Sequence, residues 1–141
     1  MDKIKEIYVP KWASYLYALL AIALVPWIIL LAQYLPAKHL ARHWDALWVG
    51  FDIIMLFNIF LTLYFVIHRK IWVIVSAASL ATLFIVDAWF DVLTARPGSD
   101  ERSSIGQAII ELTLSFLTFR LIYHIIHQST DKKDIIIRRK K

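Results

Sequence analysis

The sequence contains no charged residue from Trp12 to Ala37, and three further long apolar stretches follow. About 20 apolar residues are enough for a helix to span the hydrocarbon core of a bilayer, and the core of a signal peptide is shorter than this first stretch. The chain is 60% hydrophobic with a mean hydropathy of +0.60, far above the usual balance of soluble domains. These features predict an all-α polytopic membrane protein.

The 141 residues are expected to form a single transmembrane domain, an antiparallel four-helix bundle with a short N-terminal lead and a basic C-terminal tail. The helices are expected at about residues 12–35, 45–67, 71–94 and 104–127. Pro26 should kink the first helix and Pro36 marks its end. The short polar turn at 68–70 makes the second and third helices antiparallel neighbours, and Ser103 or Ser104 can cap the fourth.

Basic residues predict the orientation of the bundle, because Lys and Arg accumulate on the cytoplasmic side of membrane proteins. Eleven of them lie at the termini and the middle turn: Lys3, Lys5, Lys11, Arg69, Lys70, Lys132, Lys133, Arg138, Arg139, Lys140 and Lys141. Four lie in the other two loops: Lys38, Arg42, Arg96 and Arg102. Both termini are therefore expected in the cytoplasm, with the protein in the plasma (inner) membrane.

The sequence lacks residues and motifs that several classes of function require. The absence of Cys excludes disulfides, thiolate metal sites and cysteine nucleophiles. The net charge is +5, but the basic residues lie at the ends of the apolar segments, which suits anionic lipid headgroups better than nucleic acid. Because no phosphate-binding glycine loop, nucleophile elbow or histidine-rich metal motif occurs, an enzyme is the less favoured class.

Carboxyl groups within the apolar segments are the strongest functional signal. Asp87 and Asp91 are four residues apart, so both lie on one face of the third helix. At 1.5 Å of rise per residue, Asp87, Asp52 and Glu111 each lie roughly 10 Å below the outer end of a helix. Because a carboxylate in hydrocarbon is expensive, such residues face the protein interior or a wet cavity. Three helices are therefore expected to bring these acids to one level in the outer half of the bilayer.

Other polar residues are expected to support this group. Gln107 and Ser115 share a helix face with Glu111, and Asp45 and Trp48 share one with Asp52. Asn58 points elsewhere and is expected to form a helix–helix hydrogen bond. The third helix also carries small residues that would let a neighbour approach closely: Ser76, Ala77, Ala78, Ser79 and Ala81.

Four neighbouring carboxyl groups cannot all be ionised in a medium of low dielectric constant. Either some of them hold protons, or a cation neutralises them. Oxygen ligands alone select hard cations such as Na⁺, Ca²⁺, Mg²⁺ or Mn²⁺. The alternative is that the acids are protonated or hydrogen-bonded and only hold the helices in register.

A second polar group lies at the cytoplasmic end of the fourth helix. Arg120, His124 and His127 follow a spacing of four and three residues, so they share one face. They could form a proton exit or a headgroup site. The interpretation we favour is that Arg120 extends its charge to the interface and that both histidines are interfacial.

Three motifs carry a resemblance to a known group of proteins. They are WVGFD at 48–52, DAWFDVLTARPG at 87–98 and the glutamate of IIELTLSFL at 109–117. In these the chain resembles small four-span integral membrane proteins of bacteria, especially actinobacteria. The resemblance covers the second to fourth helices, implies the same fold and supports the acids, but implies no activity.

The leading hypothesis is therefore binding of a cation or protons by Asp52, Asp87, Asp91 and Glu111, in a transport, sensing or coupling role. Two alternatives stay open: a non-catalytic accessory or assembly subunit of a membrane complex, and a lipid-modifying enzyme that uses an acid pair. The expected partners are the lipid bilayer and either further copies of the chain or a larger membrane protein. No nucleic acid is expected.

Overall fold

A computed structural model describes residues 9–34 and 43–138, with side chains described up to residue 128. Over these residues the chain forms four α-helices: α1 (Lys11–Tyr34), α2 (Trp44–Ile67), α3 (Val73–Thr94) and α4 (Ser99–Arg138). The all-α fold predicted from the sequence is confirmed. Residues 1–8, 35–42 and 139–141 lie outside the described residues, and with them Pro36 and several basic residues on which the topology prediction rests: Lys3, Lys5, Lys38, Arg42, Arg139, Lys140 and Lys141.

Four helices of the described chain are long and apolar enough to cross a membrane: Lys11–Tyr34, Trp44–Ile67, Val73–Thr94 and Ser99–Gln128. Most of their large apolar side chains point outwards, for example Ile22 at 72% and Phe57 at 68% exposure. In water such a surface would aggregate, whereas lipid tails solvate it well. The protein is a multi-pass membrane protein.

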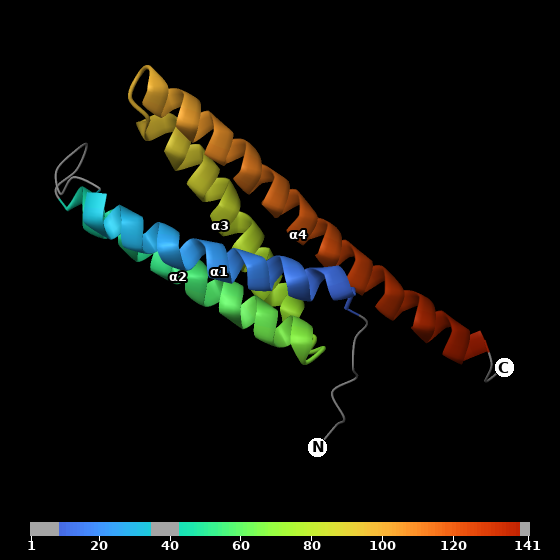
Figure 1. Cartoon of the computed structure of the whole chain (residues 1–141). Helices are drawn as coiled ribbons and strands as arrows, with labels where there is room; N and C mark the ends of the chain where they lie inside the picture. The colour runs from blue at the N-terminus through green and yellow to red at the C-terminus, as the bar shows by residue number, and fades with distance from the viewer. Residues whose placement is uncertain (1–8, 35–42, 139–141) are drawn as a thin grey trace.

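The helices pack as two pairs that cross (Figure 1). α1 lies along α2 and α3 lies along α4, and contacts between α2 and α3 join the pairs. The start of α1 and the end of α4 lie at one end of the bundle, here called the terminal end. At the opposite end, called the distal end, α1 finishes, α2 begins and residues 95–98 connect α3 to α4. The pairs diverge towards the distal end (Figure 1).

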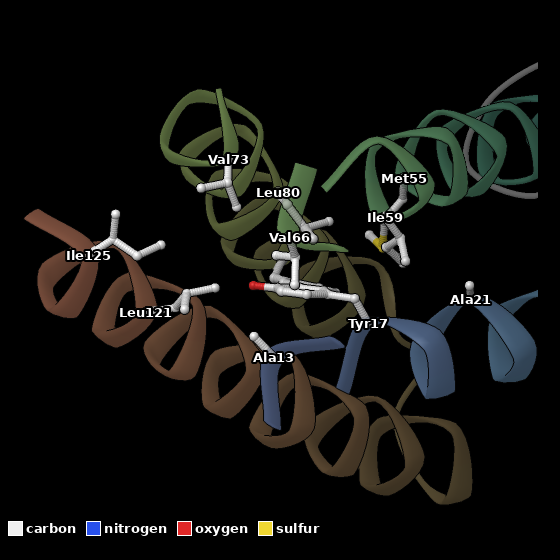
Figure 2. Packing of buried hydrophobic residues seen from close by; sticks show 11 residues of the cluster. Ala13, Tyr17, Ala21, Met55, Ile59, Val66, Val73, Leu80, Leu121 and Ile125 are labelled. Carbon is white, nitrogen blue, oxygen red and sulfur yellow. The ribbon is translucent and has the colours of Figure 1, made fainter. Parts of the chain in front are cut away.

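The apolar core closes the half of the bundle nearer the terminal end. Tyr17 lies at its centre, with Val66 and Leu80 on one side and Leu121 on another (Figure 2). The Tyr17 side chain is fully buried, and its hydroxyl donates a hydrogen bond to Thr118 Oγ1 at 3.1 Å. This bond connects α1 to α4, the helices that start and finish the bundle.

Tyr17→Phe is expected to lower the free energy of unfolding by about 0.6 to 1.7 kcal/mol, from the average to the largest value found by double-mutant cycles for hydrogen bonds between membrane helices. The hydroxyl of Thr118 would lose its partner while the ring would still fill its place in the core. Denaturation of the purified protein in mixed micelles measures the change. Tyr15→Phe is the matched control, because Tyr15 is 75% exposed on the same helix. Equal loss in both variants would contradict the structural role of this bond.

The turn between α2 and α3 shows why these helices are antiparallel neighbours, as the sequence predicted. Arg69 has φ +50°, and its N–H donates to the carbonyl of Val66 at 3.3 Å. The Lys70 N–H donates to the carbonyl of Phe65 at 2.9 Å. These two bonds form a Schellman motif, which satisfies the last carbonyl groups of a helix and reverses the chain. α3 then begins at Val73 rather than at the expected residue 71.

The expected start of the fourth helix is wrong. α4 begins at Ser99, and Ser103 and Ser104 lie inside it rather than capping it. The Arg96 N–H donates to Asp100 Oδ2 at 2.9 Å, and acidic residues in the first turn favour a helix N-terminus. The turn signals that suggested a loop up to residue 100 are therefore satisfied by residues 95–98, with Gly98 at φ +115°. α4 also continues past the apolar segment, whose end was expected at about residue 127, to Arg138. Its backbone hydrogen bonds form within the helix, so polar residues can extend it beyond the membrane.

Small residues let α3 lie close to its neighbours. Ala77 and Ala81 are fully buried, and the Ser115 hydroxyl of α4 donates to the Ala81 carbonyl at 2.9 Å. The Asn58 side chain of α2 donates to Ser79 Oγ at 2.7 Å, which confirms the expected helix–helix bond. In the half of the bundle nearer the terminal end, polar side chains therefore connect helices.

Candidate functional site: an acidic cavity at the distal end

A cavity of about 440 Å³ lies between the helix pairs at the distal end. All four helices and the 95–98 connection contribute to its wall. The lining residues are Trp27, Leu31, Trp44, Trp48, Asp52, Asp87, Asp91, Thr94, Ala95, Arg96, Asp100, Ser103, Ser104, Gln107 and Glu111. The volume falls within the range of small-molecule sites, roughly 300 to 1,000 Å³.

The four acids that the sequence singled out all line this cavity. Asp52 comes from α2, Asp87 and Asp91 from α3, and Glu111 from α4. Asp52 is 3% exposed and Asp87 is 8% exposed, so both carboxyl groups are held inside the protein. Asp91 lies one helical turn nearer the distal end than Asp87. The structure therefore brings together four carboxyl groups that are up to 59 positions apart in the sequence (111 − 52 = 59).

The depth of Glu111 differs from the expectation because α4 begins earlier than expected. Counted from Ser99, Glu111 lies about 18 Å along its helix rather than about 10 Å. It still reaches Asp87, because α3 and α4 pack along their length. The contact between these helices, and not the common depth from each helix end, is what joins these two acids.

Asp87 and Glu111 are close enough for a side-chain hydrogen bond between their carboxyl groups. Such a bond requires a proton on one of the two groups, since two ionised carboxylates offer only acceptors. Glu111 Oε2 and Asp52 Oδ2 are buried and have no hydrogen-bond partner among the described residues. The deep part of the cavity therefore holds at least one proton site and two carboxyl oxygens without a hydrogen-bond partner among the described residues.

The mouth of the cavity is formed by different residues. Arg96 and Asp100 line it from the turn before α4 and from its first turn. On the opposite side the rings of Trp44 and Trp48 meet edge to face, with centroids 5.7 Å apart and planes at 74°. Both tryptophans are almost fully buried, at 7% and 9% exposure. A ligand entering from the distal end would meet aromatic rings on one side and charged groups on the other.

Two of the expected supporting residues do not line the cavity. Asp45 is half-buried in the first turn of α2, where Trp44 forms the wall instead. Ser115 is buried below the cavity in its bond to Ala81. Gln107 and Trp48 do line it, as expected.

Trp27, on α1, is a lining residue that sequence reasoning missed. The first apolar stretch carries no charged residue that would mark one of its faces, so no pattern distinguished a cavity side from a lipid side. Trp44, on α2, is a second lining residue that sequence reasoning missed. Its spacing of eight positions from Asp52 places it on the same face of α2, and this signal could have found it.

No group of three or more His, Asp or Glu side chains among the described residues has the arrangement to hold a metal ion. The acids line the wall without converging on one point. Among the described residues, the carboxyl groups are therefore not arranged as the main ligands of a dehydrated divalent cation, which usually takes six to eight oxygen atoms.

The second predicted polar group lies at the terminal end. Arg120 and His124 line a cavity of about 490 Å³ together with Pro10, Trp12, Leu117 and Tyr123. His127 is exposed, and its ring lies 4.5 Å from the ring of Tyr123. This group is separated from the acids by the packed core around Tyr17, so the two polar regions do not share a cavity.

Comparisons with protein-family models, with curated proteins and with solved structures find no match to this chain. The resemblance to small four-span bacterial membrane proteins stays a prediction.

Proposed function

We propose that this protein binds protons at the carboxyl groups of its distal cavity, in exchange with a cation, in a transport, sensing or coupling role. The observation that carries the proposal is the contact between Asp87 and Glu111 inside the membrane-spanning part of the bundle. A shared proton satisfies the hydrogen bond of this pair. A cation that enters the cavity would neutralise the negative charge of the carboxylates in its place, so the proton could leave.

The surroundings of the pair support exchange rather than permanent protonation. Asp52 from α2 and Asp91 from α3 face it, and Arg96 and Asp100 lie at the mouth. The part of α1 that lines the cavity contributes only Trp27 and Leu31, neither of which titrates. With several carboxyl groups along one open cavity, a proton has successive sites between the pair and the surface.

The proposed orientation places the cavity on the outer face of a bacterial plasma membrane, with both termini in the cytoplasm. The excess of basic residues in the terminal segments of the sequence and in the 68–70 turn supports it. The core around Tyr17 closes the path on the cytoplasmic side. Conduction through the bundle would therefore require either a second conformation or contacts with further copies or a partner.

Thermal unfolding in detergent from mildly acidic to mildly alkaline pH tests the proposal. The folded protein holds a proton that the unfolded chain releases at neutral pH, so the stability of the wild type should fall as the pH rises. In Asp87→Asn the amide can donate to an ionised Glu111, and no proton is then needed. The stability of this variant should therefore depend less on pH.

The same assay with Na⁺, K⁺, Mg²⁺, Ca²⁺ and Mn²⁺ identifies an inorganic cation, because a ligand at 100 times its dissociation constant adds about 2.7 kcal/mol. Asp45→Asn is the matched control, since Asp45 lies on α2 but does not line the cavity. Its pH dependence should equal that of the wild type. Identical pH dependence in wild type and Asp87→Asn would overturn the proposal.

A non-catalytic accessory subunit is the second candidate, and one observation favours it. Away from the cavity, the buried polar side chains of Tyr17 and Ser115 and the amide of Asn58 serve helix–helix contacts. If the acids act in the same way, each should stabilise the bundle. The effect on stability of removing a buried acid therefore distinguishes the two candidates.

A further inference from the structure

The walls of the distal cavity differ in chemistry. Its apolar side consists of Trp27 and Leu31 from α1 and Trp44 and Trp48 from α2. Its polar lining carries five carboxyl groups and one guanidinium group among the described residues: Asp87, Asp91, Asp100, Glu111 and Arg96 from α3, α4 and the connection between them, and Asp52 from α2, beside the tryptophans. The excess of acids favours a cationic ligand, and the tryptophan rings favour one with an apolar surface.

Asp52 gives independent evidence for a ligand. Its side chain is 3% exposed, it lines the cavity, and its Oδ2 atom has no hydrogen-bond partner in the part of the chain that the structure describes. A buried acceptor without a partner costs free energy, and it is normally satisfied by a donor. Trp48 lies one turn from Asp52 on the same face of α2, so a donor that reaches Asp52 also reaches an indole ring.

An inorganic cation fits these observations poorly. The described residues offer no group of three acidic or histidine ligands around one point. Indole rings are not ligands of hard cations, whereas their faces attract organic ammonium groups. A volume of about 440 Å³ also exceeds the needs of a single ion and suits a small molecule.

We infer that the cavity binds a protonated amine carried on an apolar body, with its N–H donating to Asp52 and its apolar part lying against the tryptophan rings. The helix pairs diverge at this end (Figure 1). On α1, the side chain of Trp27 is 41% exposed. An amphiphilic amine can therefore enter from the lipid as well as from the water. This inference rests on the proposed function, since the amine is the cation that exchanges with the proton of the Asp87–Glu111 pair.

Isothermal titration of the protein in lipid nanodiscs tests the inference, with empty nanodiscs to subtract partitioning into lipid. The probes are N-methyldibenzylamine, which is protonated and carries one N–H, and dibenzyldimethylammonium, which has the same charge and no N–H. The amine should bind more tightly, and its affinity should fall as the pH is lowered, because protons compete for the cavity. Benzyl alcohol, an uncharged aromatic, should not bind.

Asp52→Asn should lower the affinity for the amine about tenfold to a hundredfold, since a hydrogen bond to a charged group is lost. Trp27→Leu should lower the affinity for both cations about twofold to thirtyfold, because the contact with the indole ring is lost. Trp27 is partly exposed, so this variant keeps the fold if Asp52→Asn does not. Asp45→Asn should leave both affinities unchanged.

Equal binding of the two cations with no effect of Asp52→Asn would overturn the assignment of the N–H donor. Absence of heat above that of empty nanodiscs, in a protein whose stability still depends on pH through Asp87, would overturn the amine inference and leave the proposed function intact. If the stability of the wild type and that of Asp87→Asn depend on pH in the same way, the proposed function is overturned, whatever the titrations show. If Na⁺ or Mg²⁺ gives a heat of binding and the amine gives none, the amine inference is overturned and the ligand is an inorganic ion.

Discussion

Ala81→Leu is expected to lower the free energy of unfolding by about 3 kcal/mol, the upper part of the range for overpacking a filled site. Ala81 is fully buried between α3 and α4, and its carbonyl accepts a hydrogen bond from Ser115. A leucine side chain there would push the helices apart and lengthen that bond. Close contact is what holds helices together in lipid, because lipid tails are as apolar as leucine and supply no hydrophobic force between helices.

Denaturation of the variant in mixed micelles measures this loss. Thr82→Leu is the control, since Thr82 is the next residue of α3, is exposed, and bonds only to the carbonyl of Ala78 in its own helix. A leucine at position 82 would meet lipid, and its stability should stay close to that of the wild type. Equal stability of the two variants would contradict the close packing of α3 against α4.

Asp52→Leu is expected to raise the free energy of unfolding by about 1 to 3 kcal/mol, the cost of a buried polar group without a partner. The carboxyl of Asp52 is almost fully buried, and one of its oxygens is unsatisfied. Leucine has the same branched arrangement of four side-chain heavy atoms, and its larger methyl groups can extend into the cavity beside Trp48 without any need for a donor. A site that is kept for ligand binding commonly reduces stability in this way.

The direction of this change separates the two candidate functions. If the acids bind protons and a cation, Asp52→Leu is more stable than the wild type and loses the ligand. If they hold the helices in register, the same variant is less stable. Asp45→Leu is the control: it replaces an acid near the start of α2, where a negative charge favours the helix, so it should be slightly destabilising in either case.

The membrane class and the four helices followed from the sequence alone. A long uncharged stretch such as 12–37 has one stable environment, and backbone groups in hydrocarbon must bond within their own helix. Local signals were sufficient for the turn at 68–70, because its bonds join residues within five positions of one another. They were misleading at 96–104, where turn residues and helix-starting residues overlap and only the backbone geometry at Gly98 separates them.

The candidate site divides in the same way. An acid in an apolar helix is expensive wherever that helix packs, so Asp52, Asp87, Asp91 and Glu111 could be identified from composition and spacing. Which acids meet was decided by the packing of α3 on α4, since the contact of Asp87 with Glu111 depends on the position of one helix along another. The tryptophan wall was also decided by packing, because Trp27 has no local feature that distinguishes a cavity from lipid. Burial of the acids was determined by the sequence, whereas their neighbours were determined by the crossing of the two helix pairs.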